Sequence, residues 1–539
     1  MLIMKKLLNT FAICAMVLAF SSCQDWITEP SPGATTVSDF YTSSTAAVQN
    51  VNAAYVPLMW EFNSTYFPEW FIGDVVSDDA LKGGQYVKTD MGDVYDMENF
   101  KTNTNNTFLL EFYRAQFQGV QRCNLVLKYV PNMDDALFAD APVGLKQRVI
   151  AEAKFLRAMY YFRLVRVFGG VPLVLEPLTT DDQWHQDRAT IDQVYAQIIA
   201  DLEDAEKDLW KKSDTRFTLK DLGRATQGAA QAMLLKVNLY QHNYEVARSW
   251  GDKVIQSGEY DLCANYADNF TLEGENGVES VFEIQYMQDP NSDYGEGYGF
   301  TRGTFSVVLT RSRSEFFAGK TGWGFNKPTN NLYNEFEEGD PRRDITIWNP
   351  TDDQITNPSE EIYLGTRLCS RKYALYNETT TDCYTLTHAT RGPINNKVIR
   401  YADVLLMYAE ACEQAGAGVS GDAQWALEEV RARARANAAD ASALPAYPNY
   451  TITINGTEIN PTLQEAIRHE RRVELAMEGH RWFDLCRWGV AKATMDAYIA
   501  TESAEAQAEY GQFIEGKNEL FPIPSQEIDL NEMTQNPMY

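Results

Sequence analysis

Aromatic and acidic side chains alternate in one short stretch near the N-terminus. Asp74, Asp78 and Asp79 cluster there between Trp70 and Tyr86. The faces of sugar rings are rich in C–H groups that stack on tryptophan and tyrosine, and carboxylates accept hydrogen bonds from sugar hydroxyls. The mixture is typical of a loop that carries a binding surface. It therefore favours recognition of a carbohydrate.

A second region with the composition of a loop contributes more aromatic residues. The helical periodicity fades over residues 279–400, where glycine and tyrosine are frequent. Irregular segments of this length are either functional or disordered, and the aromatic content argues against disorder. If the fold brings the two regions together, their aromatic residues form an exposed platform. Core packing or loop stacking is the competing interpretation for any one of these residues. The predicted ligand-binding residues are Trp70, Asp78, Asp79, Tyr86, Tyr294, Tyr298 and Trp323.

The acidic cluster leaves other chemistry open. Asp74, Asp78 and Asp79 are close enough in sequence to bind calcium, or simply to form a solvated turn with helix-capping side chains. The chain contains 75 acidic residues, so some pair can always be proposed as the acid and nucleophile of a glycosidase. Without a cleft, that abundance carries no weight.

Motifs for catalysis and cofactor binding are missing from the sequence. His469-Glu470 resembles the start of a zinc-protease motif, but the required second histidine would fall at Val473. The Gly-x-Gly-x-Gly run at 295–299 follows no strand-to-helix turn, so it is read as a flexible loop. We therefore expect no enzyme activity, no cofactor and no metal centre.

The N-terminus has the pattern of an export signal. A pair of lysines precedes a mostly apolar run over residues 7–20, which is too short to span a bilayer comfortably. Two serines and Cys23 follow directly, as in a bacterial lipoprotein cleavage site. We predict a signal peptide over residues 1–22, lipidation of Cys23, and an extended tether over residues 23–36. An ordinary secretory signal with an incidental cysteine is the alternative.

The net charge and the cysteine spacing exclude several classes of protein. A formal charge of −28 repels nucleic acid and anionic lipid. The absence of a Cys-x-x-Cys pair excludes a zinc ribbon and a thioredoxin-like redox motif. Cys412 and Cys486 lie on apolar helical stripes and are expected to be free thiols. Whether Cys369 and Cys383 form a disulfide is left open.

The elements that must position the loops are helical. Residues 147–168 carry two apolar stripes, which predicts a central helix covered on most of its surface, ending at Gly169-Gly170. Residues 222–256 and 401–436 each read as a helix–turn–helix pair with small residues at the crossing. Such tetratricopeptide-like pairs must stack to bury their faces. With 539 residues, two intergrown subdomains or one large helical array are expected.

The sequence also predicts other helices and a hairpin. Further helices are predicted over residues 107–129, 191–209 and 463–478. Arginines and glutamates alternate along the last of these, which predicts a partly buried ion-pair network, with contact to a partner protein as the alternative. Asn455-Gly456 predicts a hairpin, and Asp340 is expected to close a short helix that begins near Thr329.

Four stretches of the chain resemble the SusD/RagB family of outer-membrane nutrient-binding lipoproteins, and together they span nearly the whole mature chain. They are AEAKFLRAMYYFRLVRVFGGVPLV (151–174), IRYADVLLMYAEACEQAG (399–416), RHERRVELAMEGHRWFDLCRWG (468–489) and FPIPSQEIDLNEMTQNPMY (521–539). The resemblance implies a cell-surface body, lipid-anchored to the outer membrane, that docks as a lid on a SusC-like TonB-dependent transporter. Gln24-Asp25 would favour export to the surface. Ligand side chains vary between family members, so none is carried over by motif.

These observations combine into one prediction. The fold is mostly α, with tetratricopeptide-like helix pairs supporting an irregular ligand-binding insertion. Residues 37–278 form an N-terminal helical region, and residues 279–539 form a C-terminal region that includes the insertion at 279–400. The predicted function is capture of an oligosaccharide and its delivery to the transporter, without bond chemistry. A peptide-binding RagB-type lid and a glycoside hydrolase are the alternatives.

Overall fold

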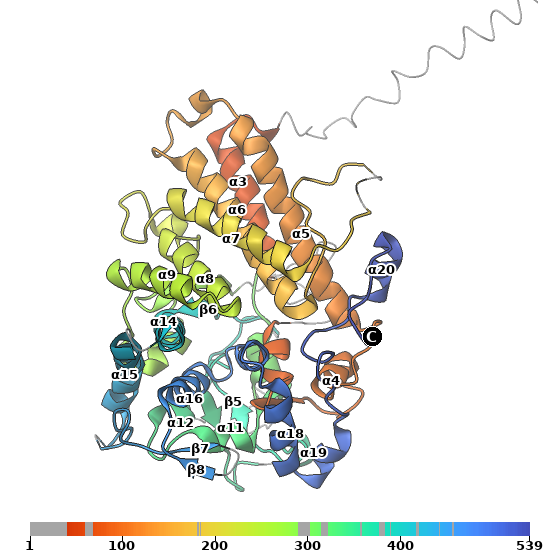
Figure 1. Cartoon of the computed structure of the whole chain (residues 1–539), viewed down its shortest axis with the longest axis vertical. Coiled ribbons are helices and arrows are strands. Elements are labelled where there is room, and N and C mark those ends of the chain that lie inside the picture. Colours follow the sequence, from red (N-terminus) through yellow and green to blue (C-terminus); the bar gives the residue numbers. More distant parts are fainter. Residues whose placement is uncertain are drawn as a thin grey trace, which may run out of the picture.

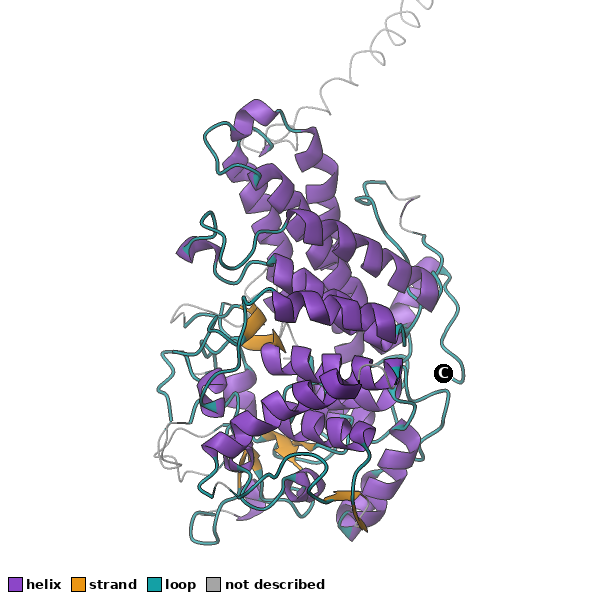
Figure 2. Ribbon diagram, turned by 60° about the vertical axis from the view of Figure 1, so that its left-hand side comes forward, coloured by secondary structure: helices purple, strands orange, loops and turns teal. Residues whose placement is uncertain are grey.

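The structure, a computed structural model, is mostly helical, with short strands and long connecting loops (Figure 2). It describes residues 40–59, 68–180, 183, 185–288, 302–313, 322–355, 358–376, 383–388, 390–416, 420–440, 442–454 and 457–539. The predicted signal peptide, Cys23 and the tether lie outside these residues. None of the helices described is both long and apolar enough to cross a membrane.

The predicted central helix is present as α6 (Leu145–Phe168). Its side chains are buried nearly all round, as the two apolar stripes predict, and it packs against α3, α5 and α7. The helix ends at Gly169, whose φ of 71° is a conformation that glycine adopts without steric cost. Tyr160 fixes the helix further by donating a hydrogen bond to the carbonyl of Ala54 at 2.6 Å.

A row of packed helices runs from the upper to the lower part of the molecule in Figure 1 and forms the scaffold. The predicted helices at 107–129 and 191–209 and both predicted helix pairs are confirmed. The row consists of α3 (Ser44–Tyr55), α5 (Thr107–Tyr129), α6, α7 (Ile191–Asp208), α8 (Gln227–Tyr240), α9 (Tyr244–Gln256), α14 (Tyr401–Ala415), α15 (Ser420–Asn437) and α16 (Leu463–Leu475).

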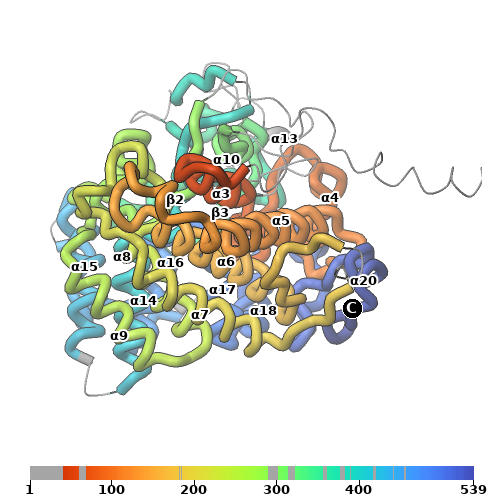
Figure 3. The backbone as a smooth tube through the Cα atoms, turned by 90° about the horizontal axis from the view of Figure 1, so that it is seen from above, coloured from red at the N-terminus to blue at the C-terminus, as the bar shows by residue number. Residues whose placement is uncertain are grey.

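The insertion leaves this row after α9 and rejoins it at α14. Strands β2 and β6 pair at its two ends and close it as an antiparallel ladder. In Figure 3, α10 lies on one side of α5 and α6, while α7 and α9 lie on the other. The elements are β2 (Ser280–Ile284), α10 (Ser306–Thr310), β3 (Phe325–Pro328), α11 (Asn330–Glu335), α12 (Pro341–Thr346), β4 (Ile347–Trp348), α13 (Pro358–Glu361), β5 (Cys369–Ser370) and β6 (Asn396–Arg400).

One expectation for the insertion is wrong. Asp340 does not close the helix that begins after Thr329, because that helix, α11, ends at Glu335. Asp340 instead caps a second helix, α12, by accepting a hydrogen bond from the backbone N–H of Arg342 at 2.9 Å. An aspartate before a proline is a helix-start signal as well as a turn signal, and here the start prevails.

The C-terminal elements wrap back onto the central helix. The backbone N–H of Phe521 donates to the carbonyl of Val167 at 2.8 Å, next to the end of α6. The predicted hairpin is present as β7 (Ile452–Ile454) and β8 (Thr457–Ile459). The remaining elements are α17 (Arg481–Arg487), α18 (Ala491–Thr501), α19 (Ala504–Glu509) and α20 (Ser525–Asn531).

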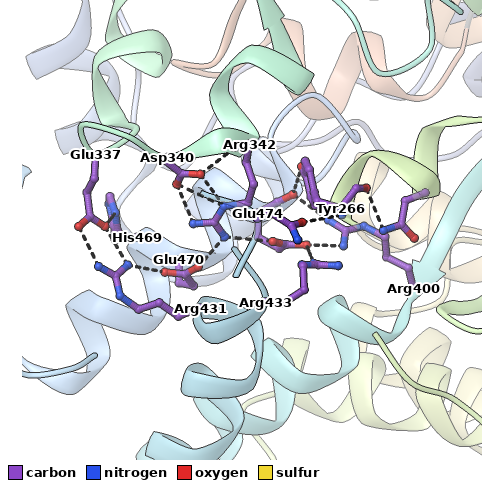
Figure 4. Close-up of polar contacts among 12 residues, drawn as sticks. Tyr266, Glu337, Asp340, Arg342, Arg400, Arg431, Arg433, His469, Glu470 and Glu474 are labelled. Atoms are coloured by element: carbon purple, nitrogen blue, oxygen red, sulfur yellow. Dashed lines mark hydrogen bonds and ion pairs between the residues drawn. The ribbon is translucent and has the colours of Figure 1, made fainter. Parts of the chain in front are cut away.

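The predicted ion-pair network of the charged helix α16 is present, and it joins the helix to neighbouring elements. Glu474 binds Arg342, Arg400 and Arg433, all buried, and Glu470 pairs with Arg342 and Arg431 (Figure 4). Arg471, three residues before Glu474, binds Asp403 and Asp484 instead. Breaking such buried pairs is costly because the charge left behind has no water around it.

The cysteines within the described residues are free thiols. Cys412 and Cys486 agree with the prediction for helical core thiols. Cys369 and Cys383 are both buried, and they form no disulfide with each other in this structure. The thiol of Cys369 donates to Glu361 Oε1 at 2.9 Å, and its burial raises its pKa, so it is an unreactive interior group.

Candidate ligand-binding region

The two predicted loop regions meet through a pair of strands. Strand β1 (Ala80–Gly83), from the N-terminal loop, pairs antiparallel with β3 of the insertion. Leu81 lies opposite Lys327, and Gly83 lies opposite Phe325. The two predicted loop regions therefore do come together, and the backbone ladder between β1 and β3 is one of the contacts that join them.

Glycines allow the two loops to approach closely at the end of this ladder. Gly83 and Gly84 both have φ near +80°, and Gly84 N–H donates to the carbonyl of Gly324 at 2.9 Å. A Cβ placed on Gly83 would lie 2.1 Å from that same carbonyl oxygen. Only glycine fits here, because both the backbone angle and the space exclude a side chain.

Lys82 organises the loop that carries Tyr86. Its buried Nζ donates to the carbonyls of Gly83, Tyr86 and Asp90 at 2.9, 3.2 and 2.6 Å. Burial lowers the pKa of Lys82 to about 8 despite the opposing effect of Glu98. The Tyr86 side chain is 59% exposed on this clamped loop. A large aromatic ring held at the surface by an ordered backbone is suited to stacking on a ligand.

Trp323 lies beside the same junction, on the chain segment that leads into β3. Its backbone N–H donates to the carbonyl of Val308 at 2.8 Å, and its ring centroid is 6.2 Å from that of Phe305. The side chain is half-buried, so one part supports the core while the other faces outward. Tyr86 and Trp323 are thus the two predicted aromatic residues that the structure places near the surface of the joined loops.

Trp70 is placed differently from the expected platform. It is only 3% exposed, and its indole N–H donates to the hydroxyl of Ser306 at 3.0 Å. The ring packs on Phe71 at a centroid distance of 4.2 Å. Trp70 therefore links the first loop to α10 from the inside, and the expectation that it is exposed is wrong. The competing interpretation, core packing, holds for this residue.

The acidic cluster is also interior. Arg481 binds Asp78 through two hydrogen bonds of 2.8 and 2.9 Å, and Arg472 contacts both Asp78 and Asp79. Burial alone would raise the pKa of Asp78, but the two guanidinium groups hold it at about 2. The expectation of exposed carboxylates is wrong, because these oxygens are already occupied by arginine.

The third acid of the cluster has a separate role. Asp74 accepts hydrogen bonds from Asn326 at 3.1 Å and from the backbone N–H of Gly479 at 2.8 Å. Burial raises the pKa of Asp74 to about 7. Across the part of the chain that the structure describes, no group of three or more His, Cys, Asp or Glu side chains is placed to hold a metal ion. The structure supplies a structural function for each of these acids.

Tyr294 and Tyr298 lie outside the described residues, so their part in the platform stays a prediction. The groups that sequence reasoning missed are Lys82, which orders the Tyr86 loop, and Arg481, which anchors Asp78. A lysine within the otherwise small and apolar strand β1 is a signal for the first. The distance in sequence between Arg481 and Asp78 leaves no local signal for the second.

Comparison with known protein families agrees with this architecture. A family model described as "SusD family" matches residues 278–539, and one described as "Starch-binding associating with outer membrane" matches residues 25–239. The match to residues 278–539 begins next to the start of the insertion. The fold is that of a helical, SusD-like protein, and the chain belongs to the SusD/RagB family.

Individual relatives agree over nearly the whole length. The chain is 26% identical over 559 residues to "SusD-like protein P2" of Formosa agariphila, covering 99% of this chain and all of that one. A "Laminarin binding SusD-like protein" superposes with a TM-score of 0.72 at 29% identity, covering 93% of this chain and 100% of the other. Surface glycan-binding protein A from Bacteroides thetaiotaomicron, solved with laminarihexaose, gives a TM-score of 0.73 at 26% identity, with coverage of 92% and 100%.

Proposed function

We propose that this protein is a cell-surface lipoprotein that captures an oligosaccharide and delivers it to a SusC-like TonB-dependent outer-membrane transporter. The observation that carries the proposal is the junction of β1 and β3, which holds Tyr86 and Trp323 on adjoining loops. Tyr294 and Tyr298 complete the proposed aromatic surface. Trp70, Asp78 and Asp79 act beneath it as supports.

The ligand is proposed to be a glycan, with a β-glucan such as laminarin the first to be tested. Solved relatives are described as binding laminarin or as holding laminarihexaose, and exposed aromatic rings beside amides and hydroxyls are what sugar rings require. Binding of a short oligosaccharide should be weak, about micromolar to millimolar, because a few stacking contacts barely exceed the cost of ordering the ligand.

The direct experiment is calorimetric titration of the mature protein with laminarihexaose, maltohexaose and cellohexaose, followed by chromatography of the sugars. Saturable binding of at least one glycan without shorter products supports the proposal. Shorter products would favour a glycoside hydrolase. Binding of short peptides with no response to any glycan would favour the peptide-binding lid.

Attachment to the outer membrane is proposed to occur through acyl chains on Cys23. Each buried methylene contributes about 0.8 kcal/mol, so several acyl chains hold the protein almost irreversibly. In cells that express Cys23→Ser, the protein should incorporate no labelled palmitate. The variant protein should also be lost from the membrane fraction. Labelling that survives this substitution would reject the anchor. Delivery is tested by co-purification with the transporter from the outer membrane.

A further inference from the structure

A cleft that Tyr86 and Trp323 do not line is formed by residues of helices α11, α16 and α18, among others. These three helices lie in the lower part of Figure 1. Its volume is about 560 Å³, which is the size of pocket that small-molecule ligands occupy. Neither Tyr86 nor Trp323 lines it. The cleft therefore does not include the proposed glycan platform, although Asp78 and Arg481, which support the loop of that platform, also line the cleft.

One stripe of α16 forms a wall of the cleft. Glu465, Arg468, His469 and Arg472 are spaced three, one and three residues apart, so they share one face of the helix. Three of these four side chains already have strong partners. Arg472 binds aspartates and Glu335, His469 lies 2.8 Å from Glu335, and Glu465 accepts hydrogen bonds from Thr462.

Arg468 is the exception. Within the described residues it makes no ion pair, and its buried Nε has no hydrogen-bond partner. Its guanidinium lies 4.7 Å from the centre of the Trp488 ring, which fixes its position. The nearby carboxylate of Glu410 is already bound by Arg487 at 2.5 and 2.7 Å and by the Trp488 indole at 2.8 Å. Glu410 and Glu413 act on the Arg468 guanidinium from a distance, but no described carboxylate forms an ion pair with it, so its donors are available to an anionic ligand.

Neutral polar groups face the same space. Asn330 and Asn334 on α11 are exposed at the cleft, and Thr494 on α18 is partly exposed there. No hydrogen bond joins the side chains of these three residues to other described residues. Amides and hydroxyls in this state can donate to and accept from the hydroxyl groups of a ligand. Leu364, Leu485 and Val490 supply apolar contact between them.

We propose that this cleft binds a small hydroxylated anion, an acidic saccharide bearing a carboxylate or sulfate group, with Arg468 receiving the acid group. Trp488 holds the guanidinium in place, and Asn330, Asn334 and Thr494 bind the hydroxyls. An arginine presents a planar pair of donors that matches a carboxylate or sulfate, which makes it the specific element of the site. The proposal does not depend on neutral glycans binding at the loop platform.

The test is titration with trigalacturonate and with a sulfated galactan tetrasaccharide, alongside neutral laminarihexaose. We expect the wild type to bind at least one acidic probe, and Arg468→Gln to weaken that binding about tenfold or more, since a charge-assisted contact is lost. Arg468→Gln should leave laminarihexaose binding unchanged. Arg216→Gln is the matched control, because Arg216 also stacks on a tryptophan, Trp210, but lies outside the cleft. It should leave the binding of the acidic probe unchanged.

Asn334→Ala provides an independent variant on a different element, at an exposed position where the fold should tolerate it. It should weaken the acidic probe several-fold with an unchanged melting temperature. The proposal is overturned if neither acidic probe binds the wild type. It is equally overturned if Arg468→Gln, shown to be folded by circular dichroism, retains full affinity. Failure of laminarihexaose alone would count against the loop platform and not against this cleft.

Discussion

Arg481 and Asp78 are 403 residues apart in sequence, yet their side chains form a bidentate ion pair with distances of 2.8 and 2.9 Å. The pair joins the start of α17 to the loop that leads into β1, and β1 in turn leads into the loop of Tyr86. A carboxylate predicted to face a ligand instead fixes the loop that does so.

Removal of the Asp78 carboxylate should destabilise the protein. Asp78→Ala leaves Arg481 without its buried partner, and the free energy of unfolding should fall by about 3–5 kcal/mol. Chemical denaturation followed by circular dichroism measures this. Asp496→Ala breaks an exposed pair with Lys492 and should cost less than about 1 kcal/mol. Equal costs for the two variants would contradict a structural function of Asp78.

Substitution of Tyr86 tests the platform without disturbing the core. Tyr86→Ala should weaken glycan binding at least several-fold with little change in melting temperature, because the ring is largely exposed. Trp323→Ala should weaken binding and also lower the melting temperature, because that ring is half-buried. Trp425→Ala removes an exposed tryptophan on α15 and should change neither quantity. Unchanged affinity in Tyr86→Ala would remove this residue from the site.

The stability of the protein should depend on pH through His469. Burial alone would lower the pKa of His469, but hydrogen bonds and charges from Glu335 and Glu337 raise it to about 9. A raised pKa in the folded state adds stability that is complete below the ordinary value of about 6.5 and is lost as pH rises through 9.

The unfolding free energy of the wild type, minus that of His469→Gln, should therefore fall by about 3 kcal/mol between pH 6 and pH 10. Urea denaturation across this range gives the difference directly. His185→Gln, which removes an exposed histidine, should follow the wild-type profile. A difference that stays constant with pH would show that the pKa of His469 is the same in the folded and unfolded states.

The close approach of the two loops can be tested at Gly83. A Cβ at this position would lie 2.1 Å from the Gly324 carbonyl oxygen, so Gly83→Ala should separate β1 from β3. Gly258 also has positive φ but has no atoms near its Cβ position. Gly258→Ala should cost about 1–2 kcal/mol for the backbone alone, and Gly83→Ala about 1–3 kcal/mol more for the clash. Gly83→Ala should also lose glycan affinity, whereas Gly258→Ala should retain it.

Sequence alone predicts the helical scaffold well because its signals are local. The helices predicted over residues 147–168 and 107–129 lie within a few residues of the observed bounds of α6 and α5, and the two apolar stripes are the signal for α6. The candidate site was only partly predictable. Trp70 and Tyr86 lie in one loop with similar surroundings in sequence, yet the first is buried against Ser306 and the second is exposed.

The difference arises from contacts between distant parts of the chain. Whether Asp78 faces solvent depends on Arg472 and Arg481, which are about 400 residues away in sequence. No local sequence pattern predicts a contact between residues so far apart. Aromatic and acidic composition marks a loop as important without saying which side chains touch the ligand. The charged stripe of α16 was informative because a helix dense in both signs of charge requires counter-charges wherever it is buried.

The antiparallel pairing of β1 with β3, together with the arginines that grip Asp78 and Asp79, means that neither half of the polypeptide is an exchangeable module. A fragment that ends before β3 would leave the edge of β1 unpaired and would leave Asp78 and Asp79 without their arginine partners. The complementary fragment would leave Arg472 and Arg481 without these carboxylates. Recombination between relatives must therefore carry both partners at once. The Tyr86 ring is largely exposed and takes no part in these pairings, so the residue type can change there while the frame beneath is retained.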